Sequence, residues 1–332
     1  MIDTLTADDL RVIGSGAVRS LERHRRQVDA LNVFPVPDGD TGGNMLGTLR
    51  AACGPEGANE EPGRGTEPSA GALLQKASMG ALMGARGNSG LILAQMLRGI
   101  AKAARGLEVL SAAVFAEGLA LASELSYRAV AEPKEGTILT VAREAAASGR
   151  AAAARGADVL GVLDAARRAA REALARTPDL LPVLKEAGVV DAAGLALCHM
   201  LDGAAQFLRH RRLALKVGRE LAQRAASRQA LAVQAQAHIE GQSDFDLRYP
   251  IEVQLVLTGP GLDLERLRAE LLPMGDSLVV AGDETQAKVH IHTDRPDETL
   301  AILQRFGQTD HVEVTDMRPQ AEAFRRNPAG EP

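Results

Sequence analysis

The chain has 332 residues, enough for two domains, and its 45 % hydrophobic and 24 % charged content is typical of a globular protein. A net charge of −5, 2 % aromatic residues and no Trp argue against nucleic-acid binding, which needs positive charge and stacking surfaces. We expect no signal peptide and no membrane span, because the N-terminal segment is acidic and no long apolar run occurs. Two Cys are too few for a disulfide scaffold, and the cytoplasm is the expected location.

Hydrophobic residues recur at helical spacing through the first part of the chain. A first helix follows Thr6 and Asp9, which resemble a capping box, and extends to about Leu31. Seven further helices are predicted at 41–53, 70–84, 90–105, 111–130, 138–153, 157–176 and 190–213. We therefore expect residues 1–213 to form an all-α domain of eight helices.

The pattern changes after this domain. Residues 214–245 are polar and rich in Ala, Gln and Arg, which favours a helical linker. Strand-like and helical segments then alternate at 252–257, 262–272, 276–281, 287–292, 296–306 and 311–314. This β-α-β-β-α-β order predicts a smaller ferredoxin-like α/β domain at 246–320, followed by a flexible tail at 321–332.

The strongest functional signal is the segment 32–45, which reads NVFPVPDGDTGGNM. Asp38 and Asp40 flank a glycine, and a hard divalent cation would relieve the repulsion between such close carboxylates. The glycines that follow expose amides at a helix start, which suit an anion. A metal that holds phosphates accounts for both features. Taken alone, the segment also fits an ordinary acidic turn.

Three more glycine-containing turns precede helices, and they read GARGNSG at 84–90, PKEGTILT at 133–140 and GVVDAAGL at 188–195. The first has the outline of a phosphate cradle, although it also fits a plain helix connection and lacks the Gly-Lys-Ser/Thr of a P-loop. Lys134 could reach a phosphate or remain solvated. Asp191 is placed to cap the next helix, which is the simpler interpretation.

Two other patterns have simpler structural explanations. The GSG at 14–16 lies within the first helix and lacks a third glycine, so helix packing explains it better than nucleotide binding. His290 and His292 alternate along a strand and share one face. They could bind zinc with a third ligand, or they could be histidines on the surface of the strand.

In combination, the four segments resemble the DhaL-type kinase domain of dihydroxyacetone kinases. They resemble more closely the N-terminal domain of the bacterial fatty acid kinase ATP-binding subunit, to which the motif NVFPVPDGDTG is specific. The sequences MGDSLVV at 274–280 and KVHIHT at 288–293 are similar to the middle domain of the same proteins. The resemblance implies an eight-helix barrel with the nucleotide at one end.

The resemblance also implies ATP and Mg²⁺ as cofactors. Magnesium would be held by Asp38 and Asp40, assisted by Asn32. Phosphate contacts are implied for Thr41, Gly42, Gly43, Asn44, Ser89 and Gly90. The nucleotide pocket would also be lined by Gly136, Thr137 and Asp191. Arg86 and Lys134 are candidates for neutralising phosphate charge during transfer.

The implied reaction is phosphoryl transfer from ATP to a fatty acid carboxylate presented by a separate carrier protein, giving acyl-phosphate for phospholipid synthesis. A carboxylate is already ionised near pH 7, so no general base is needed. The alternatives are a dihydroxyacetone (glycerone) kinase-like activity and a nucleotide-binding regulatory or scaffold protein. We expect a homodimer.

This sequence departs from the family pattern at three points. Family members carry a third, C-terminal domain that engages the carrier, and this sequence ends after the second, so a free-standing third domain is an expected partner. Pro250 stands where the family often has a Cys that joins the two strand histidines, so we expect no zinc. Ala193 replaces a glycine that is usual in the fourth segment, which we expect to be tolerated.

Overall fold

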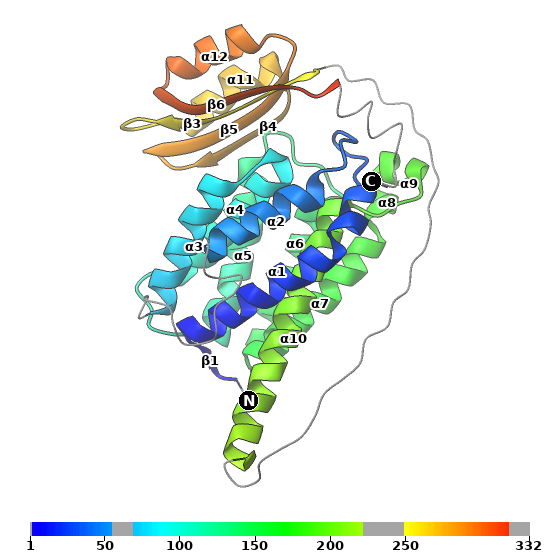
Figure 1. Cartoon of the computed structure of the whole chain (residues 1–332), viewed down its shortest axis with the longest axis vertical. Coiled ribbons are helices and arrows are strands. Elements are labelled where there is room, and N and C mark those ends of the chain that lie inside the picture. Colours follow the sequence, from blue (N-terminus) through cyan, green and yellow to red (C-terminus); the bar gives the residue numbers. More distant parts are fainter. Residues whose placement is uncertain (1, 55–68, 222–248, 319–332) are drawn as a thin grey trace.

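The computed structural model describes residues 2–54, 69–221 and 249–318. Figure 1 shows a helical domain with a smaller sheet domain packed against one of its ends. The predicted linker at 214–245 begins as a continuation of the last helix of the helical domain, which extends to Leu221, and its remainder lies outside the described residues. The predicted tail at 321–332 lies outside them as well.

The helical domain confirms the predicted all-α class. Its long helices are α1 (Ala7–Ala30), α2 (Thr41–Cys53), α3 (Ala70–Gly84), α4 (Gly87–Ala103), α5 (Ala112–Ala129), α6 (Ile138–Ala154), α7 (Val159–Ala175) and α10 (Ala192–Leu221). The sequence did not predict α8 (Thr177–Leu180), α9 (Pro182–Ala187) or the short strand pair β1 (Thr4–Leu5) and β2 (Leu110–Ser111). A closed barrel stays a prediction. Within the described residues, no helix is both long enough and apolar enough to span a membrane.

Local chemistry explains where several helices begin. The predicted capping box is present at α1, where Thr6 Oγ1 accepts from the Asp9 N–H at 3.2 Å and Asp9 accepts from the Thr6 N–H at 2.9 Å. The start of α4 was predicted three residues too late. Gly87 adopts φ +59°, and a Cβ there would lie 2.5 Å from Asn44 Nδ2, so only glycine suits this tight helix start.

The GSG pattern inside α1 serves helix packing, as the sequence indicates. A Cβ on Gly16 would lie 2.5 Å from the carbonyl oxygen of Gly203 and 2.8 Å from Phe207 Cβ. In turn, a Cβ on Gly203 would lie 2.2 Å from the carbonyl oxygen of Gly16. The two glycines therefore allow α1 and α10 to cross backbone against backbone.

Two histidine rings stack between the same helices. His24 on α1 and His199 on α10 have ring centroids 3.8 Å apart and nearly parallel planes. Among the described residues, Nε2 of His199 has no hydrogen-bond partner. Burial, followed by the neighbouring His24 and Arg171, lowers the pKa of His199 to about 4, against the smaller opposing effect of Asp202.

We expect this histidine to make the fold acid-sensitive. The unfolded chain binds a proton at His199 near pH 6.5, while the folded chain does so only near pH 4, so stability is lost as pH falls through this window. The full effect is on the order of 3 kcal/mol. Urea unfolding at pH 7.5 and pH 5 measures the part of this loss that falls above pH 5, about 2 kcal/mol. A His199→Phe variant keeps a stacked ring but should lose less stability at pH 5 than the wild type, and equal losses would contradict the assignment.

The second domain contains the predicted β-α-β-β-α-β order. Its elements are β3 (Ile251–Thr258), α11 (Leu264–Leu271), a 3₁₀ turn η1 (Leu272–Met274), β4 (Gly275–Gly282), β5 (Gln286–Thr293), α12 (Pro296–Gln304) and β6 (Gln308–Asp316). The strands lie in the order β4-β5-β3-β6, and every pairing is antiparallel. The ferredoxin-like classification stays a prediction.

The sheet is covered on both faces near β4 and β5. Helices α11 and α12 cover its outer face (Figure 1) over an apolar core that includes Leu255, Val289 and Ile291. The inner face of β4 packs on the helical domain, where Val279 and Ala281 join an apolar cluster with residues of α3, α4 and α5. The two domains therefore share a buried interface.

Candidate functional site

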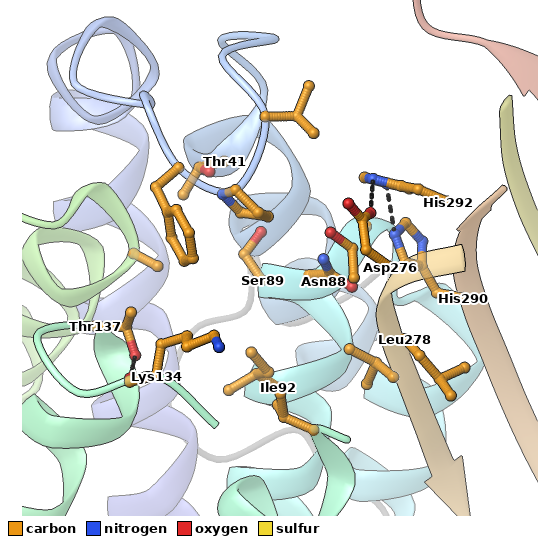
Figure 2. Close-up of a pocket in the computed structure, with 18 of the residues that line it drawn as sticks. Thr41, Asn88, Ser89, Ile92, Lys134, Thr137, Asp276, Leu278, His290 and His292 are labelled. Atoms are coloured by element: carbon orange, nitrogen blue, oxygen red, sulfur yellow. Dashed lines mark hydrogen bonds and ion pairs between the residues drawn. The ribbon is translucent and has the colours of Figure 1, made fainter. Parts of the chain in front are cut away.

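A cavity of about 390 Å³ lies between the two domains. Its walls come from the segment before α2, the start of α4, the segment between α5 and α6, the start of α10, and strands β3, β4 and β5. Figure 2 shows Ser89 and Asn88 on one side with Asp276, His290 and His292 beside them, and Lys134 and Thr137 across the space. All four sequence segments therefore meet at this cavity, as the sequence resemblance implies.

Asp38 and Asp40 both line the cavity. Asp38 Oδ1 accepts a hydrogen bond from Asn32 Nδ2 at 2.5 Å, and Asn32 itself is only 2 % exposed. Burial and then the charge of Asp40 raise the pKa of Asp38 well above its ordinary value. Partial burial and the nearby charge of Glu252 raise the pKa of Asp40, although part of this residue is exposed to solvent. A divalent cation between these carboxylates would remove the repulsion.

The start of α2 differs from the simple phosphate cradle. Thr41 and Asn44 line the cavity, but the N–H groups of Gly42 and Gly43 donate to Asp29 Oδ1 at 2.7 and 3.1 Å. Asp29 comes from the last turn of α1 and was not identified from the sequence. Phosphate contacts from the two glycines stay a prediction, since they would require Asp29 to release these amides.

The loop between α3 and α4 and the first turn of α4 border two cavities. Ser89 lines the main cavity, whereas Arg86 lines a smaller one of about 170 Å³ next to it. Gly90 faces α2, because a Cβ there would lie 2.6 Å from Thr48 Oγ1. The phosphate role implied for Gly90 therefore stays a prediction, and the structure shows a packing role.

Lys134 and Thr137 line the far wall of the cavity. Lys134 is exposed and lies 3.3 Å from the carboxylate of Glu132. Thr137 caps α6 by accepting from the Leu139 N–H at 3.4 Å. Gly136 does not line the cavity, and with φ +82° it packs against the carbonyl oxygen of Thr177.

Asp191 both caps a helix and lines the cavity. Its Oδ2 accepts from the Gly194 N–H at 2.7 Å at the start of α10, and the backbone N–H of Ile138 bonds to the same carboxyl. The side chain is 4 % exposed. Burial raises the pKa of Asp191 to about 7 against these two hydrogen bonds.

We expect Asp191→Ala to lower the free energy of unfolding by about 1–3 kcal/mol, because two buried N–H groups lose their acceptor. Asp191→Asn keeps an oxygen acceptor and is the matched control. Folded Asp191 keeps its proton up to about pH 7, whereas the unfolded chain keeps it only to about pH 4. The stability of the wild type therefore falls as pH rises from about 4 to about 7. The Asn variant should therefore be the more stable one at pH 8 in urea unfolding, and a less stable Asn variant would contradict this account.

The two strand histidines are not on the surface. His290 and His292 are 2 % and 4 % exposed, and their Nε2 atoms lie 3.1 Å apart. Glu252 Oε1 lies 3.1 Å from His290 Nδ1, and Asp276 Oδ1 lies 3.7 Å from His292 Nδ1. The surface interpretation is wrong because the helical domain covers this face of the sheet. Burial lowers the pKa of His292 to about 3, with a smaller contribution from the neighbouring His290.

Across residues 2–54, 69–221 and 249–318, no group of three or more His, Cys, Asp or Glu side chains is arranged to hold a metal ion. The expectation of no zinc stays a prediction. A magnesium ion at Asp38 and Asp40 would fit the residues present, because Mg²⁺ commonly takes one or two carboxylates and completes its shell with water and phosphate oxygens.

The sequence pattern did not assign any residue of the second domain to this cavity. The structure adds Glu252, Leu272, Gly275, Asp276, Ser277, Leu278, Val279, His290 and His292 to its lining. The available signal was the alternation along β5, which puts polar side chains on the face opposite the apolar core.

Comparison with known proteins gives two family matches and several relatives. Residues 35–206 match the DAK2 domain, and residues 246–324 match the middle domain of FakA-like fatty acid kinase proteins. Protein YloV of Bacillus subtilis is 37 % identical over 310 residues, which cover 91 % of this chain and 54 % of that protein. An uncharacterized protein of Staphylococcus saprophyticus is 36 % identical over 313 residues, with 91 % and 53 % covered. The chain spans about half the length of the curated relatives it matches.

The two family matches follow the division seen in the structure. The first includes α2 to α7 and reaches into α10, and the second includes every strand and helix of the sheet domain. The DAK2 match alone extends over more than half of the chain. The chain therefore belongs to the kinase-related DAK2-domain family, and its second domain is similar to the middle domain of FakA-like fatty acid kinase proteins.

Proposed function

We propose that this protein binds ATP with Mg²⁺ and transfers the γ-phosphoryl group, acting as a kinase subunit. The observation that carries the proposal is the interdomain cavity, in which Asp38 and Asp40 lie with the N-terminal end of α4. Amides at a helix start favour phosphate oxygens, and paired carboxylates suit the cation that those phosphates bring. The kinase-related family supports the same activity.

In this proposal, Asp38 and Asp40 hold the magnesium ion, and Asn32 orients Asp38 through its hydrogen bond. The bound ion supplies neutralisation of phosphate charge. Ser89 and the amides that follow Gly87 in the first turn of α4 would orient the phosphates, and Lys134 on the opposite wall would neutralise phosphate charge. Positioning and charge neutralisation are the main contributions a protein makes to phosphoryl transfer.

We also propose the acceptor: a fatty acid carboxylate presented by a separate carrier protein, giving acyl-phosphate for phospholipid synthesis. The match to the middle domain of FakA-like fatty acid kinase proteins supports this choice. An ionised carboxylate can attack without a general base. Association as a homodimer, and with a free-standing third domain, belongs to the same proposal.

Calorimetry of the whole chain with ATP tests the nucleotide step. We expect binding in Mg²⁺ and at least about tenfold weaker binding in excess chelator, and equal affinity in the two conditions would contradict the proposal. A transfer assay then measures how much label passes from γ-labelled ATP to each of three acceptors: fatty acid with a carrier protein, fatty acid alone, and dihydroxyacetone. Transfer of the label to dihydroxyacetone and to neither fatty acid sample would favour the glycerone kinase alternative. Binding without transfer to any acceptor would favour a regulatory nucleotide-binding protein.

A further inference from the structure

The second domain holds the segment between α5 and α6 through the backbone. Val130 forms an antiparallel bridge with Val279, and the Ala131 N–H donates to the carbonyl oxygen of Leu278 at 3.2 Å. Strand β4 is the edge of its sheet, so it has backbone groups available for this pairing. The segment it holds leads directly to Lys134 on the wall of the cavity.

The second domain holds the loop between α3 and α4 through two side chains. Lys288 on β5 donates from Nζ to the carbonyl oxygen of Ala85 and lies 3.5 Å from that of Met83. Gln254 on β3 accepts from the Gly87 N–H through Oε1 at 3.2 Å. These contacts satisfy backbone groups at the end of α3 and the start of α4, which have no partner within their own helices.

Both side chains are buried at this interface. Lys288 is 8 % exposed and Gln254 is 5 % exposed. The charged groups near Lys288 are Glu313, which favours its ammonium form, and Arg86, which opposes it. A buried ammonium group is costly unless it is hydrogen-bonded, so the carbonyl oxygens of the loop are its required partners.

The segment held in this way leads into the first turn of α4, which lines the cavity where we propose that the nucleotide binds. Asn88 and Ser89 follow the Gly87 amide directly and line the main cavity, as Figure 2 shows. We infer that Lys288 and Gln254 are positioning residues that hold residues 85–89 in the geometry that binds nucleotide phosphates. The inference rests on the proposed function, because it places the phosphates at this loop.

A Lys288→Met variant tests the inference, since it keeps the length of the side chain and removes the donor. We expect the Kd for a non-hydrolysable ATP analogue with Mg²⁺ to rise about tenfold, and the KM for ATP to change more than kcat. Hydrogen exchange at residues 85–89 should accelerate. Gln254→Leu removes the second contact and should act in the same direction, which keeps the test valid if Lys288→Met fails to fold.

Arg98→Ala is the matched control. Arg98 donates to the carbonyl oxygen of Gly282 and pairs with Asp283 at 3.1 Å, so it joins the same two domains without touching the loop. Its nucleotide affinity should equal that of the wild type. Equal weakening in Lys288→Met and Arg98→Ala would overturn the inference, because general domain docking would then explain both.

Wild-type affinity in both Lys288→Met and Gln254→Leu would also overturn the inference, while leaving the proposed function intact. If the wild-type chain itself binds no nucleotide, the proposed function fails first and the inference fails with it. Nucleotide binding by the wild type thus separates the two failures.

Discussion

Asp38→Asn is expected to abolish phosphoryl transfer, with kcat falling by about a hundredfold or more. The substitution keeps the shape of the side chain and its place beside Asn32 but removes one of the two charges proposed to hold magnesium. Asp40→Asn should have the same effect. Steady-state kinetics at saturating ATP and Mg²⁺ measure the loss, and activity within about threefold of wild type would exclude the proposed metal role.

The same variants should not destabilise the fold without ligand. The pKa of Asp38 is raised by its burial and by Asp40, which means that the folded state disfavours the two charges together. Thermal unfolding without Mg²⁺ should therefore show an equal or higher Tm, and the stabilisation of the wild type by MgATP should be lost. Asp297→Asn, which changes an exposed carboxylate on α12, is the control and should behave as the wild type. A large loss of helical circular dichroism in Asp38→Asn would mean that the pair is structural.

Gly16→Ala is expected to lower the free energy of unfolding by about 1–3 kcal/mol. The added methyl group would lie 2.5 Å from the Gly203 carbonyl oxygen, a backbone atom that cannot rotate away. Helices α1 and α10 would have to separate along their crossing. Equilibrium urea unfolding followed by circular dichroism measures the change.

Gly47→Ala is the matched substitution, because it places the same methyl group in α2 with nothing within 4 Å. There the change removes the entropy cost of a helical glycine and should stabilise the protein by about 0.5–1 kcal/mol. The two variants should therefore shift stability in opposite directions. A neutral or stabilising Gly16→Ala would show that the helices are not in the close contact described.

The candidate site was predictable where its residues are local in sequence. Asp38 and Asp40 stand out because two carboxylates flank a glycine between two prolines and a helix start. Asp29, which occupies the amides of Gly42 and Gly43, could not be found in this way. It is an unremarkable helix residue until the chain folds back and brings the end of α1 against the start of α2.

The contribution of the second domain was also beyond the sequence pattern. Alternation along β5 indicates that Lys288, His290 and His292 share one face, and solvent is the ordinary place for such a polar face. The structure buries it instead, because Val279 and Ala281 on the neighbouring strand pack on the helical domain. Sequence spacing gives no sign of which element covers a sheet face.

By itself, the sequence determined the long helices of the first domain and the order of strands and helices along the chain in the second, since both follow from hydrophobic period, capping residues and turn residues. It also determined the four segments that meet at the cavity. Only the tertiary structure decided that the cavity lies between the domains, that Asp29 holds the α2 amides, and that Lys288 and Gln254 bind the loop at residues 85–87. The physical reason is that these contacts join residues far apart in sequence, and their geometry depends on how whole helices and strands pack.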